Sequence, residues 1–370
     1  FGSRRCSSLA PVELPWGCPA PMSPLANLPR PSAASSMLRW GLLLTPFAWG
    51  QEASLSFLLI GDWGGDTDSH PVSRGESDCA AGMGKVAEQL RANFVLGLGD
   101  NFYDSGIHSG NKFRFNATFE STFAAESLNV DWYIVAGNHD HLGSVQYQID
   151  YSGQSRRWKF PAASYTFQRS LPSGKVADFV MFDSVTVAGM SYHDSATGAF
   201  VAAPGPADAV AAESQWQWLE DQLAASKADY LFVGTHYPVW SVCAHGSTKS
   251  FVSRLRPLLT KYEVTAFLSG HDHCLMHIEE DGNYFVLSGA GAEAWYSAHN
   301  KNRIGNAQLK WYMAKDNKQS FDGGFASITL TDSAAAVRYY GNDGTQVFAA
   351  APKPPRSHSR SARQDTVIAV

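Results

Sequence analysis

The sequence contains little cysteine and little charge. Five cysteines occur in 370 residues and none belongs to a Cys-x-x-Cys pair, which argues against a structural zinc site and a disulfide-rich scaffold. Charged residues make up 17% of the chain, with 29 Lys and Arg against 34 Asp and Glu, and no long basic run could neutralise a nucleic-acid backbone. No apolar run reaches the length of a bilayer-spanning helix. We therefore expect neither a nucleic-acid partner nor a stable membrane span.

Apolar side chains, in contrast, are plentiful. Hydrophobic residues make up 44% of the sequence and aromatic residues 12%, which excludes a disordered chain and a coiled coil. The composition predicts a folded domain over residues 54–349. A Pro-, Ser- and Ala-rich upstream or linker segment over 1–36 and a Pro-, Ser- and Arg-rich tail over 350–370 are both expected to be disordered.

Residues 37–53 have the layout of a signal peptide. Met37 and a basic residue precede the apolar run 41–49, which is too short to cross a bilayer and is followed by small residues. The alternative interpretation is an N-terminal strand or another buried segment. With Met37 as the start, the mature chain begins near Gln51 and is secreted or lumenal, as in a lysosome or vacuole. The sequon at Asn116 then predicts an N-glycan on a surface loop, although sequons also arise by chance.

Between residues 54 and 348, short apolar runs alternate with helical patterns, which indicates an α/β fold. We predict helices over 79–92, 213–225 and 249–261. We predict strands over 54–60, 94–99, 132–136, 179–182, 230–233, 264–268, 284–287, 325–330, 335–340 and 346–349. Parallel strands from the first half and antiparallel strands from the second half are expected to form packed sheets with helices outside. A flexible insert rich in Ala, Gly and Pro is expected over 193–212.

Polar side chains stand where five of the predicted strands end. They are Asp62, Asp100, the pair Asn138 and His139, His236, and the segment His271, Asp272 and His273. Ligands in open α/β sheets bind outside the carboxyl ends of the strands. These strand ends are therefore expected to converge on one crevice.

The donor types in this set point to metal ions. Two carboxylates, an amide and several histidines suit Fe, Zn or Mn better than Ca or Mg. They exceed what one ion can use once positions for water and substrate stay open, so two ions that share a carboxylate fit better and are suited to phosphate chemistry. Each piece also has an ordinary interpretation, since Asp62 could cap a helix and residues 137–140 could form a turn. The alternate histidines of segment 270–273 are harder to explain in that way.

These residues resemble the signature of the metallophosphoesterase superfamily, and finer details resemble its purple acid phosphatases. The superfamily usually has a histidine two residues after the first aspartate, but Gly64 stands there. Tyr103 stands three residues after Asp100, as in purple acid phosphatases. The small tartrate-resistant acid phosphatase type is matched in the motifs Gly61–Gly65, Gly99–Tyr103, Ala136–His141, His236–Ser241, Gly270–His273 and Ser288–Gly291.

The resemblance implies a fold and a metal centre. The fold is a four-layer α/β/β/α sandwich of two mixed β-sheets flanked by helices, with the metallophosphoesterase catalytic domain over 54–349. The centre holds Fe(III) and a second, divalent metal, which is Fe, Zn or Mn. By position, the ferric ligands are Asp62, Asp100, Tyr103 and His273. The divalent ligands are Asp100, Asn138, His236 and His271, with Asp100 bridging.

The resemblance also implies an activity. The protein is expected to be a monomeric acid phosphatase that hydrolyses phosphate monoesters by attack of metal-bound hydroxide. His139 and His245 match catalytic histidines that bind the phosphate and protonate the leaving alcohol. Two other functions stay open. One is a phosphodiesterase or protein phosphatase of the wider superfamily, which Gly64 and Tyr103 disfavour, and the other is an iron-binding or redox protein that uses the same centre.

Other residues near the motifs are assigned lesser roles. His108, His141 and His277 are expected to be surface or packing residues, and Asp272 is expected to orient a neighbouring ligand or cap a turn. The vertebrate members carry a disulfide near the insert, but the matching positions here are Ala188 and Ser250. The sequence does not decide whether Cys243 pairs with Cys274, and a packed thiol is the expectation for Cys274. By resemblance, insert 193–212 covers the active site, and we hypothesise that nicking it raises activity.

Overall fold

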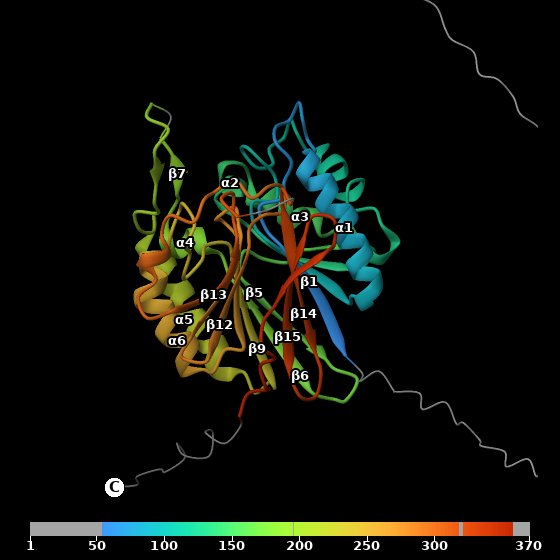
Figure 1. The fold of residues 1–370 in the computed structure, drawn as a ribbon. Helices are drawn as coiled ribbons and strands as arrows, with labels where there is room; N and C mark the ends of the chain where they lie inside the picture. Colours follow the sequence, from blue (N-terminus) through green and yellow to red (C-terminus); the bar gives the residue numbers. More distant parts are fainter. Residues whose placement is uncertain (1–53, 195, 318–320, 358–370) are drawn as a thin grey trace, which may run out of the picture. The chain divides into compact units, whose positions relative to one another are not determined.

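The computed structural model describes residues 54–194, 196–317 and 321–357. The predictions for residues 1–53, including the signal peptide, and for residues 358–370 lie outside these ranges. Within the described ranges, no helix combines the length and hydropathy that a membrane crossing demands. Two seven-stranded sheets form the core of the domain. A separate hairpin, β7 (Tyr192–His193) with β8 (Phe200–Val201), projects beyond them (Figure 1).

The first sheet has the order β16-β15-β14-β1-β2-β3-β4. Its parallel strands are β1 (Leu55–Ile60), β2 (Phe94–Leu98), β3 (Asp131–Val135) and the short β4 (Trp158–Lys159). Its antiparallel strands are β14 (Gly324–Leu330), β15 (Ala335–Gly341) and β16 (Gln346–Ala349). The first and last parts of the domain therefore share one sheet, because β14 pairs directly with β1.

The second sheet has the order β13-β11-β12-β10-β9-β6-β5. Its parallel strands are β6 (Val176–Met181), β9 (Tyr230–Gly234), β10 (Ala266–Ser269) and β12 (Asn283–Ser288). Its antiparallel strands are β5 (Tyr165–Ser170), β11 (Leu275–Glu280) and β13 (Gln308–Met313). Parallel strands thus occur in both halves of the chain, which corrects the expected division into a parallel first half and an antiparallel second half.

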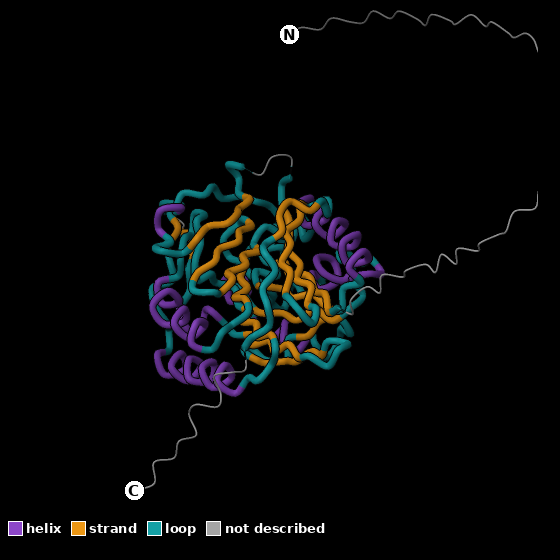
Figure 2. The backbone as a smooth tube through the Cα atoms, turned by 60° about the horizontal axis from the view of Figure 1, so that its bottom comes forward, coloured by secondary structure: helices purple, strands orange, loops and turns teal. Residues whose placement is uncertain are grey.

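Helices lie outside both sheets. The α-helices are α1 (Arg74–Leu90), α2 (Asn138–Leu142), α3 (Val145–Tyr151), α4 (Ser184–Ala188), α5 (Ala209–Ala225) and α6 (Arg256–Lys261). Short 3-10 or π turns cover Phe115–Glu120, Glu126–Leu128, Phe251–Leu255 and Lys301–Arg303. Figures 1 and 2 show α1 on one flank and α5 and α6 on the other, with the strands between them. The predicted four-layer α/β/β/α sandwich is confirmed.

Two helices differ from their predicted bounds for local reasons. α1 begins at Arg74 rather than at residue 79 because Ser73 forms a capping box: its Oγ accepts from Glu76 N at 3.0 Å, and Glu76 Oε2 accepts from Ser73 N at 3.2 Å. The helix predicted over 249–261 is a π turn followed by the shorter α6, which has a proline in its first turn.

Aromatic rings fill the space between the two sheets. The Phe57 ring of β1 lies edge-on to Phe179 of β6 and Phe232 of β9, with centroid distances of 5.3 and 5.5 Å. All three side chains are fully buried, and burying one such ring contributes about 1.5–3 kcal/mol. On the outer face of the second sheet, Trp216 and Leu219 of α5 join a separate buried cluster. The contacts of Phe57 hold the two sheets face to face, and the outer cluster attaches α5 to the second sheet.

The folded part of the chain extends beyond the predicted boundary at residue 349. Lys353 forms a bridge with Ala335 of β15, and its ammonium group donates to the carbonyls of Val264 and Thr265 at 2.9 and 2.7 Å. Arg356 N donates to Asp229 O at 2.8 Å. Residues 350–357 of the predicted tail are therefore attached to β15 of the first sheet and to the chain that precedes β9 and β10 of the second.

Candidate metal centre

The ends of parallel strands from both sheets carry the predicted ligands. Asp62 follows β1, Asp100 follows β2 and His271 follows β10. All three have left-handed backbones, with φ of 58°, 50° and 73°. This conformation costs roughly 1–2 kcal/mol for a residue with a side chain, and such strain clusters at functional sites. The chain is thus bent at each of these strand ends so that the side chain enters the same crevice.

Glycines beside the ligands leave room for the carboxylates. A Cβ atom at Gly137 would lie 2.2 Å from Asp100 Oδ1, and one at Gly270 would lie 2.5 Å from Asp62 Oδ2. Both distances are far below van der Waals contact. The glycines of these two motifs are therefore explained by close packing of backbone against ligand side chains.

Tyr103 joins one half of the centre. Its Oη lies 3.2 Å from Asp62 Oδ1, 3.2 Å from Asp100 Oδ2 and 3.0 Å from His273 Nε2. Burial raises the pKa of Tyr103 well above its usual value, and the charges of Asp100 and Asp62 raise it further. A phenolate at this position therefore needs a strong positive charge beside it.

His236 and Asn138 join the other half. His236 Nε2 lies 3.3 Å from Asp100 Oδ2 and 3.1 Å from Asn138 Oδ1. His236 Nδ1 lies 2.8 Å from Leu98 O, a carbonyl that requires a donor, so Nε2 is the nitrogen that faces the crevice and could bind a metal ion once it loses its proton. Burial lowers the pKa of His236, but the charge of Asp100 outweighs this and raises the pKa to about 9.

His271 completes this half with an unpaired nitrogen. Its Nδ1 is buried and has no hydrogen-bond partner. Burial, and then the charges of His245 and His236, hold the pKa of His271 well below its usual value, so the ring is neutral. Ligand atoms of Asp100, His236 and His271 all lie within 4.8 Å of one another. The backbone N of His271 donates to Asp62 Oδ2 at 2.8 Å, which links the half that contains His236 to the half that contains Tyr103.

The residues present fit a pair of metal ions. The structure brings all seven predicted ligands together, and Asp100 Oδ2 lies between Tyr103 Oη of one half and His236 Nε2 of the other. A buried set of carboxylates, imidazoles, an amide and a phenol is suited to iron, zinc or manganese. The unpaired His271 nitrogen is the kind of buried atom that a metal ion would satisfy.

Comparisons with known proteins agree with this geometry. The calcineurin-like phosphoesterase family matches residues 55–275. Tartrate-resistant acid phosphatase type 5 of Oryctolagus cuniculus is 40% identical over 311 residues, which cover 83% of this chain and 93% of that protein. Purple acid phosphatase 4 of Arabidopsis thaliana is 30% identical over 304 residues, which cover 80% and 83%. The chain belongs to the purple acid phosphatase family.

The resemblance found in the sequence is thereby confirmed, and with it membership of a family of hydrolases. One solved structure has the same fold as this chain. It is GAP50, described as the anchor in the inner membrane complex of Plasmodium, with a TM-score of 0.68 and 20% identity over 83% of this chain and 91% of that chain. At this identity the likeness concerns the fold alone.

Gly64, the departure from the superfamily pattern, has a steric cause. A Cβ atom at Gly64 would lie 2.3 Å from the carbonyl carbon and oxygen of Asn101. The segment that presents Tyr103 therefore fills the space that a side chain at position 64 would need. The buried guanidinium of Arg114 joins the two segments, because it donates to Gly64 O at 2.6 Å and also to Tyr103 O. Arg114 was missed from the sequence because it lies in no motif.

The two predicted catalytic histidines lie beside the seven predicted ligands rather than among them. His139 N donates to Asp100 Oδ1 at 2.9 Å, and its ring centroid lies 4.7 Å from that of Tyr103. The His245 ring lies 4.5 Å from that of His271, centroid to centroid. His245 Nε2 is buried and has no hydrogen-bond partner.

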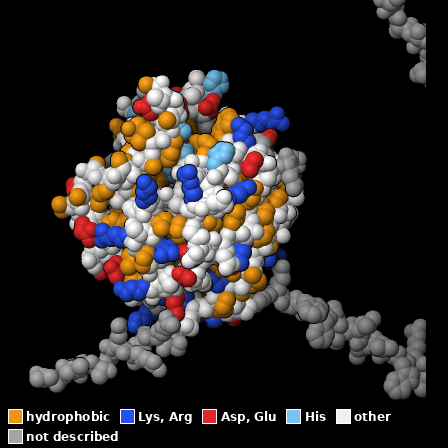
Figure 3. All heavy atoms as spheres, turned by 60° about the vertical axis from the view of Figure 1, so that its left-hand side comes forward, with side chains coloured by type: hydrophobic (Ala, Val, Ile, Leu, Met, Phe, Trp, Pro, Cys, Tyr) orange, Lys and Arg blue, Asp and Glu red, His pale blue; other side chains and the backbone are white. Residues whose placement is uncertain are grey.

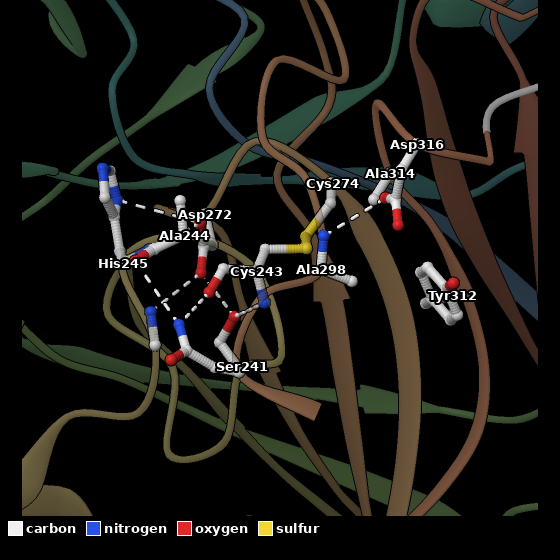
Figure 4. Close-up of a disulfide and its surroundings, with 12 residues drawn as sticks. Ser241, Cys243, Ala244, His245, Asp272, Cys274, Ala298, Tyr312, Ala314 and Asp316 are labelled. Atoms are coloured by element: carbon white, nitrogen blue, oxygen red, sulfur yellow. Dashed lines mark hydrogen bonds and ion pairs between the residues drawn. A yellow bond between two sulfur atoms is a disulfide. The ribbon is translucent and has the colours of Figure 1, made fainter. Parts of the chain in front are cut away.

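Asp272 connects the loop that carries His245 (the His245 loop) to the segment of residues 271–273 that contains two predicted ligands (the ligand segment). The Asp272 carboxylate accepts from Ser241 Oγ, from His245 N at 3.2 Å and from Gly246 N at 3.1 Å (Figure 4). Asp272 is fully buried between two predicted ligands. These bonds match the second part of the prediction, that Asp272 caps a turn, and the turn belongs to the loop that carries His245.

A disulfide reinforces the same loop. Cys243 pairs with Cys274, the residue after His273, with their Cα atoms 6.9 Å apart (Figure 4). The expectation of a packed thiol at Cys274 is therefore wrong. The hydrogen bonds to Asp272 bring the loop against the ligand segment, and this long-range contact could not be derived from a separation of 31 residues in sequence.

The insert covers His245. The expected flexible segment 193–212 forms the β7–β8 hairpin and leads into the start of α5. The Phe200 ring stacks on the His245 ring with a centroid distance of 3.9 Å and an angle of 14° between planes. His193 lies 5.7 Å from His245, ring to ring.

The three histidines expected to be surface or packing residues contact other side chains. One buried carboxylate was not predicted to have a role. His277 is buried against Tyr339, and half-exposed His108 lies 3.4 Å from an Asp68 carboxylate oxygen. His141 Nε2 pairs with Asp183 Oδ2 at 2.8 Å, which links α2 to the start of α4. The overlooked residue is Asp140, which is fully buried and accepts from the backbone N of Asn101 and Gly137.

Proposed function

We propose that this protein is an acid phosphatase that hydrolyses phosphate monoesters at a dinuclear centre of Fe(III) and a divalent Fe, Zn or Mn ion. Asp62, Asp100, Tyr103 and His273 would hold the ferric ion, and Asp100, Asn138, His236 and His271 the divalent ion. The observation that carries this proposal is the position of Asp100 Oδ2, 3.2 Å from Tyr103 Oη and 3.3 Å from His236 Nε2. When bound, the two ions would activate a water molecule and neutralise the phosphoryl oxygens.

The chain itself would supply binding and proton transfer. His139 lies against Tyr103 at the rim of the centre, where its ring can hydrogen-bond a phosphoryl oxygen. His245 presents a buried, unpartnered Nε2. Burial lowers the pKa of His245 well below its usual value, so its proposed role in protonating the leaving alcohol requires that the negative charge of a bound phosphate stabilise the protonated ring. Asp272 and the disulfide would hold His245 at the required place relative to the ligand segment.

The compartment is part of the proposal. A Cys243–Cys274 disulfide persists in an oxidising environment, which supports a secreted or lumenal protein. Asn116 is exposed, which supports N-glycosylation there. A signal peptide over 37–53, a catalytic domain over 54–349 and a monomeric state remain parts of the same proposal.

The test combines metal analysis with spectroscopy. The purified protein is expected to contain iron, to absorb visible light through tyrosinate-to-iron charge transfer, and to hydrolyse an aryl phosphate at acidic pH. Tyr103→Phe should lose the visible band, while Tyr133→Phe, which changes a tyrosine of β3 outside the centre, should keep it. Stoichiometric iron and colour without turnover of the aryl phosphate would instead favour an iron-binding or redox protein.

A further inference from the structure

A cavity of about 810 Å³ opens beside the proposed centre. His245 and His271 form part of its wall, and Phe200 and the residues that follow it in the insert form another part. A cavity of this volume is typical of small-molecule sites. Because His245 faces both the centre and this cavity, a group attached to the leaving oxygen of a substrate would extend into it.

The cavity wall combines apolar surface with positive charge. Ala188, Ala203, Pro204 and Val252 contribute apolar atoms, and Lys249 and Arg303 contribute cations. No Asp or Glu is among the residues that line it. Within the described ranges, neither Lys249 nor Arg303 makes a side-chain hydrogen bond or an ion pair. Figure 3 shows histidines in a hollow of this face, with Lys and Arg side chains beside it.

Both cations are carried by segments that are bonded to the His245 loop. Arg303 ends a 3-10 turn that follows Asn300, and Asn300 N donates to Val242 O at 2.8 Å. Lys249 follows Thr248, whose N donates to Pro238 O at 3.3 Å. The backbone at each cation is therefore fixed relative to His245, although the two side chains reach into solvent.

We propose that this cavity is a leaving-group subsite that selects phosphate monoesters whose alcohol carries a second negative charge on an aromatic or short apolar body. The proposal rests on the proposed phosphatase function, because it assigns the direction in which the alcohol leaves. The apolar wall would contact the body of the alcohol. Lys249 and Arg303 would pair with its distal anion, without a competing carboxylate among the lining residues.

Two matched substrates test this selection. 4-Carboxyphenyl phosphate and 4-carbamoylphenyl phosphate have nearly the same shape. At about pH 6, well above the usual carboxyl pKa, only the first carries a negative charge on its alcohol part in addition to the charge of the phosphate group. We expect wild-type kcat/KM to favour the carboxylate roughly three- to tenfold through KM, as two partly exposed charge pairs at low salt would give. The double variant Lys249→Gln/Arg303→Gln should lose most of this preference. Comparing the preference between proteins cancels the difference in leaving-group reactivity.

A control variant removes the same charge elsewhere. Lys227 and Lys261 precede β9 and β10, at the opposite ends of those strands from His236 and His271. Lys227→Gln/Lys261→Gln should therefore keep the wild-type preference. An equal loss in this control, no preference in the wild type, or an unchanged preference in Lys249→Gln/Arg303→Gln would each overturn the subsite.

A binding measurement separates the subsite from the phosphatase function. Calorimetry with 4-hydroxybenzoate and 4-hydroxybenzamide, the two alcohol products, requires no turnover. Tighter binding of 4-hydroxybenzoate that is lost in Lys249→Gln/Arg303→Gln would support the subsite. Equal binding of the two products would contradict it. Failure to hydrolyse either ester, in contrast, would count against the proposed function, whichever product binds more tightly.

Discussion

The rings of Phe200 and His245 lie stacked, 3.9 Å apart between centroids. One residue belongs to the insert hairpin and the other to the loop beside the metal centre. The insert therefore occupies one face of the histidine proposed to protonate the leaving alcohol. Catalysis would require either a substrate that fits around this stack or an insert that moves away from it.

Removing the Phe200 ring should raise activity. Phe200→Ala would free His245 from a stacking contact of about 0.5–1.5 kcal/mol, so kcat for an aryl phosphate should rise roughly two- to tenfold. Tyr192→Ala is the control, because Tyr192 is an exposed aromatic of the same hairpin and makes no ring contact with His245. Limited proteolysis confined to residues 194–208 should have the same effect as Phe200→Ala. Unchanged turnover in both experiments would show that the insert does not restrain His245.

Asp272 should control proton transfer to the leaving group. An amide at this position would present an NH2 group to donors such as Gly246 N, so Asp272→Asn should loosen the His245 loop. We expect kcat for phenyl phosphate to fall about tenfold, a partial loss of the roughly 10²- to 10⁴-fold that general acid catalysis supplies. The fall should be smaller for 4-nitrophenyl phosphate, whose leaving group needs less protonation. A control, Asp316→Asn, changes an exposed carboxylate and should alter neither rate.

Equal losses for the two substrates in Asp272→Asn would indicate a general disruption of the centre instead. Metal content measured on the same preparations distinguishes the two cases, because a positioning role would leave the metal content unchanged. Ser241→Ala, which removes one of the donors to Asp272, should show the same substrate dependence in weaker form.

A side chain at position 64 should damage the proposed iron site through Tyr103. Gly64→Ala places a Cβ atom 2.3 Å from Asn101 backbone atoms, so the segment must shift, at a cost of about 1–3 kcal/mol. We expect a lower melting temperature together with a weaker visible band. Gly153→Ala has its nearest contact at 3.4 Å and should change neither. A fully coloured and stable Gly64→Ala protein would refute the steric link between Gly64 and Tyr103.

The pair of His141 and Asp183 should stabilise the fold more in acid than in base. Burial lowers the pKa of His141, but the hydrogen bond and charge of Asp183 outweigh it and raise the pKa above 6.5. A raised folded-state pKa contributes stability that is complete below the unfolded value, about 6.5, and is lost as pH rises through the folded value.

The check compares unfolding of His141→Gln with wild type by urea titration. The variant should lose about 0.5–1 kcal/mol at a pH near 5.5 and less at a pH near 9, since His141 is partly exposed. His108→Gln, which alters a half-exposed histidine beside Asp68, serves as the control for the loss of a histidine near a carboxylate. A loss that grows with pH would contradict the assigned direction of the pKa shift.

Local patterns predicted most of the strands and the convergence of their ends. Apolar runs marked β1, β2 and β3, and the polar residue after each run identified Asp62, Asp100 and Asn138. The helical pattern over 213–225 also located most of α5, which begins earlier, at Ala209. These features depend on residues close together in sequence, where periodicity and turn chemistry are informative.

Features that depend on distant contacts could not be derived in this way. β5, β11 and β13 lie at or near a sheet edge and lack a continuous apolar run, so partner strands rather than local pattern define them. The Cys243–Cys274 disulfide and the position of Arg114 follow from how separate loops pack. The stacking of Phe200 on His245 likewise requires knowledge of where the insert folds back.

The centre draws its ligands from two separate sheets. Asp62, Asp100 and Asn138 follow strands of the first sheet, whereas His236 and His271 follow strands of the second. Metal ions bound by ligands from both sheets would link the two sheets, so part of their binding free energy would add to the free energy of unfolding. Removal of the ions by a chelator should then lower the stability of the folded domain as well as its activity.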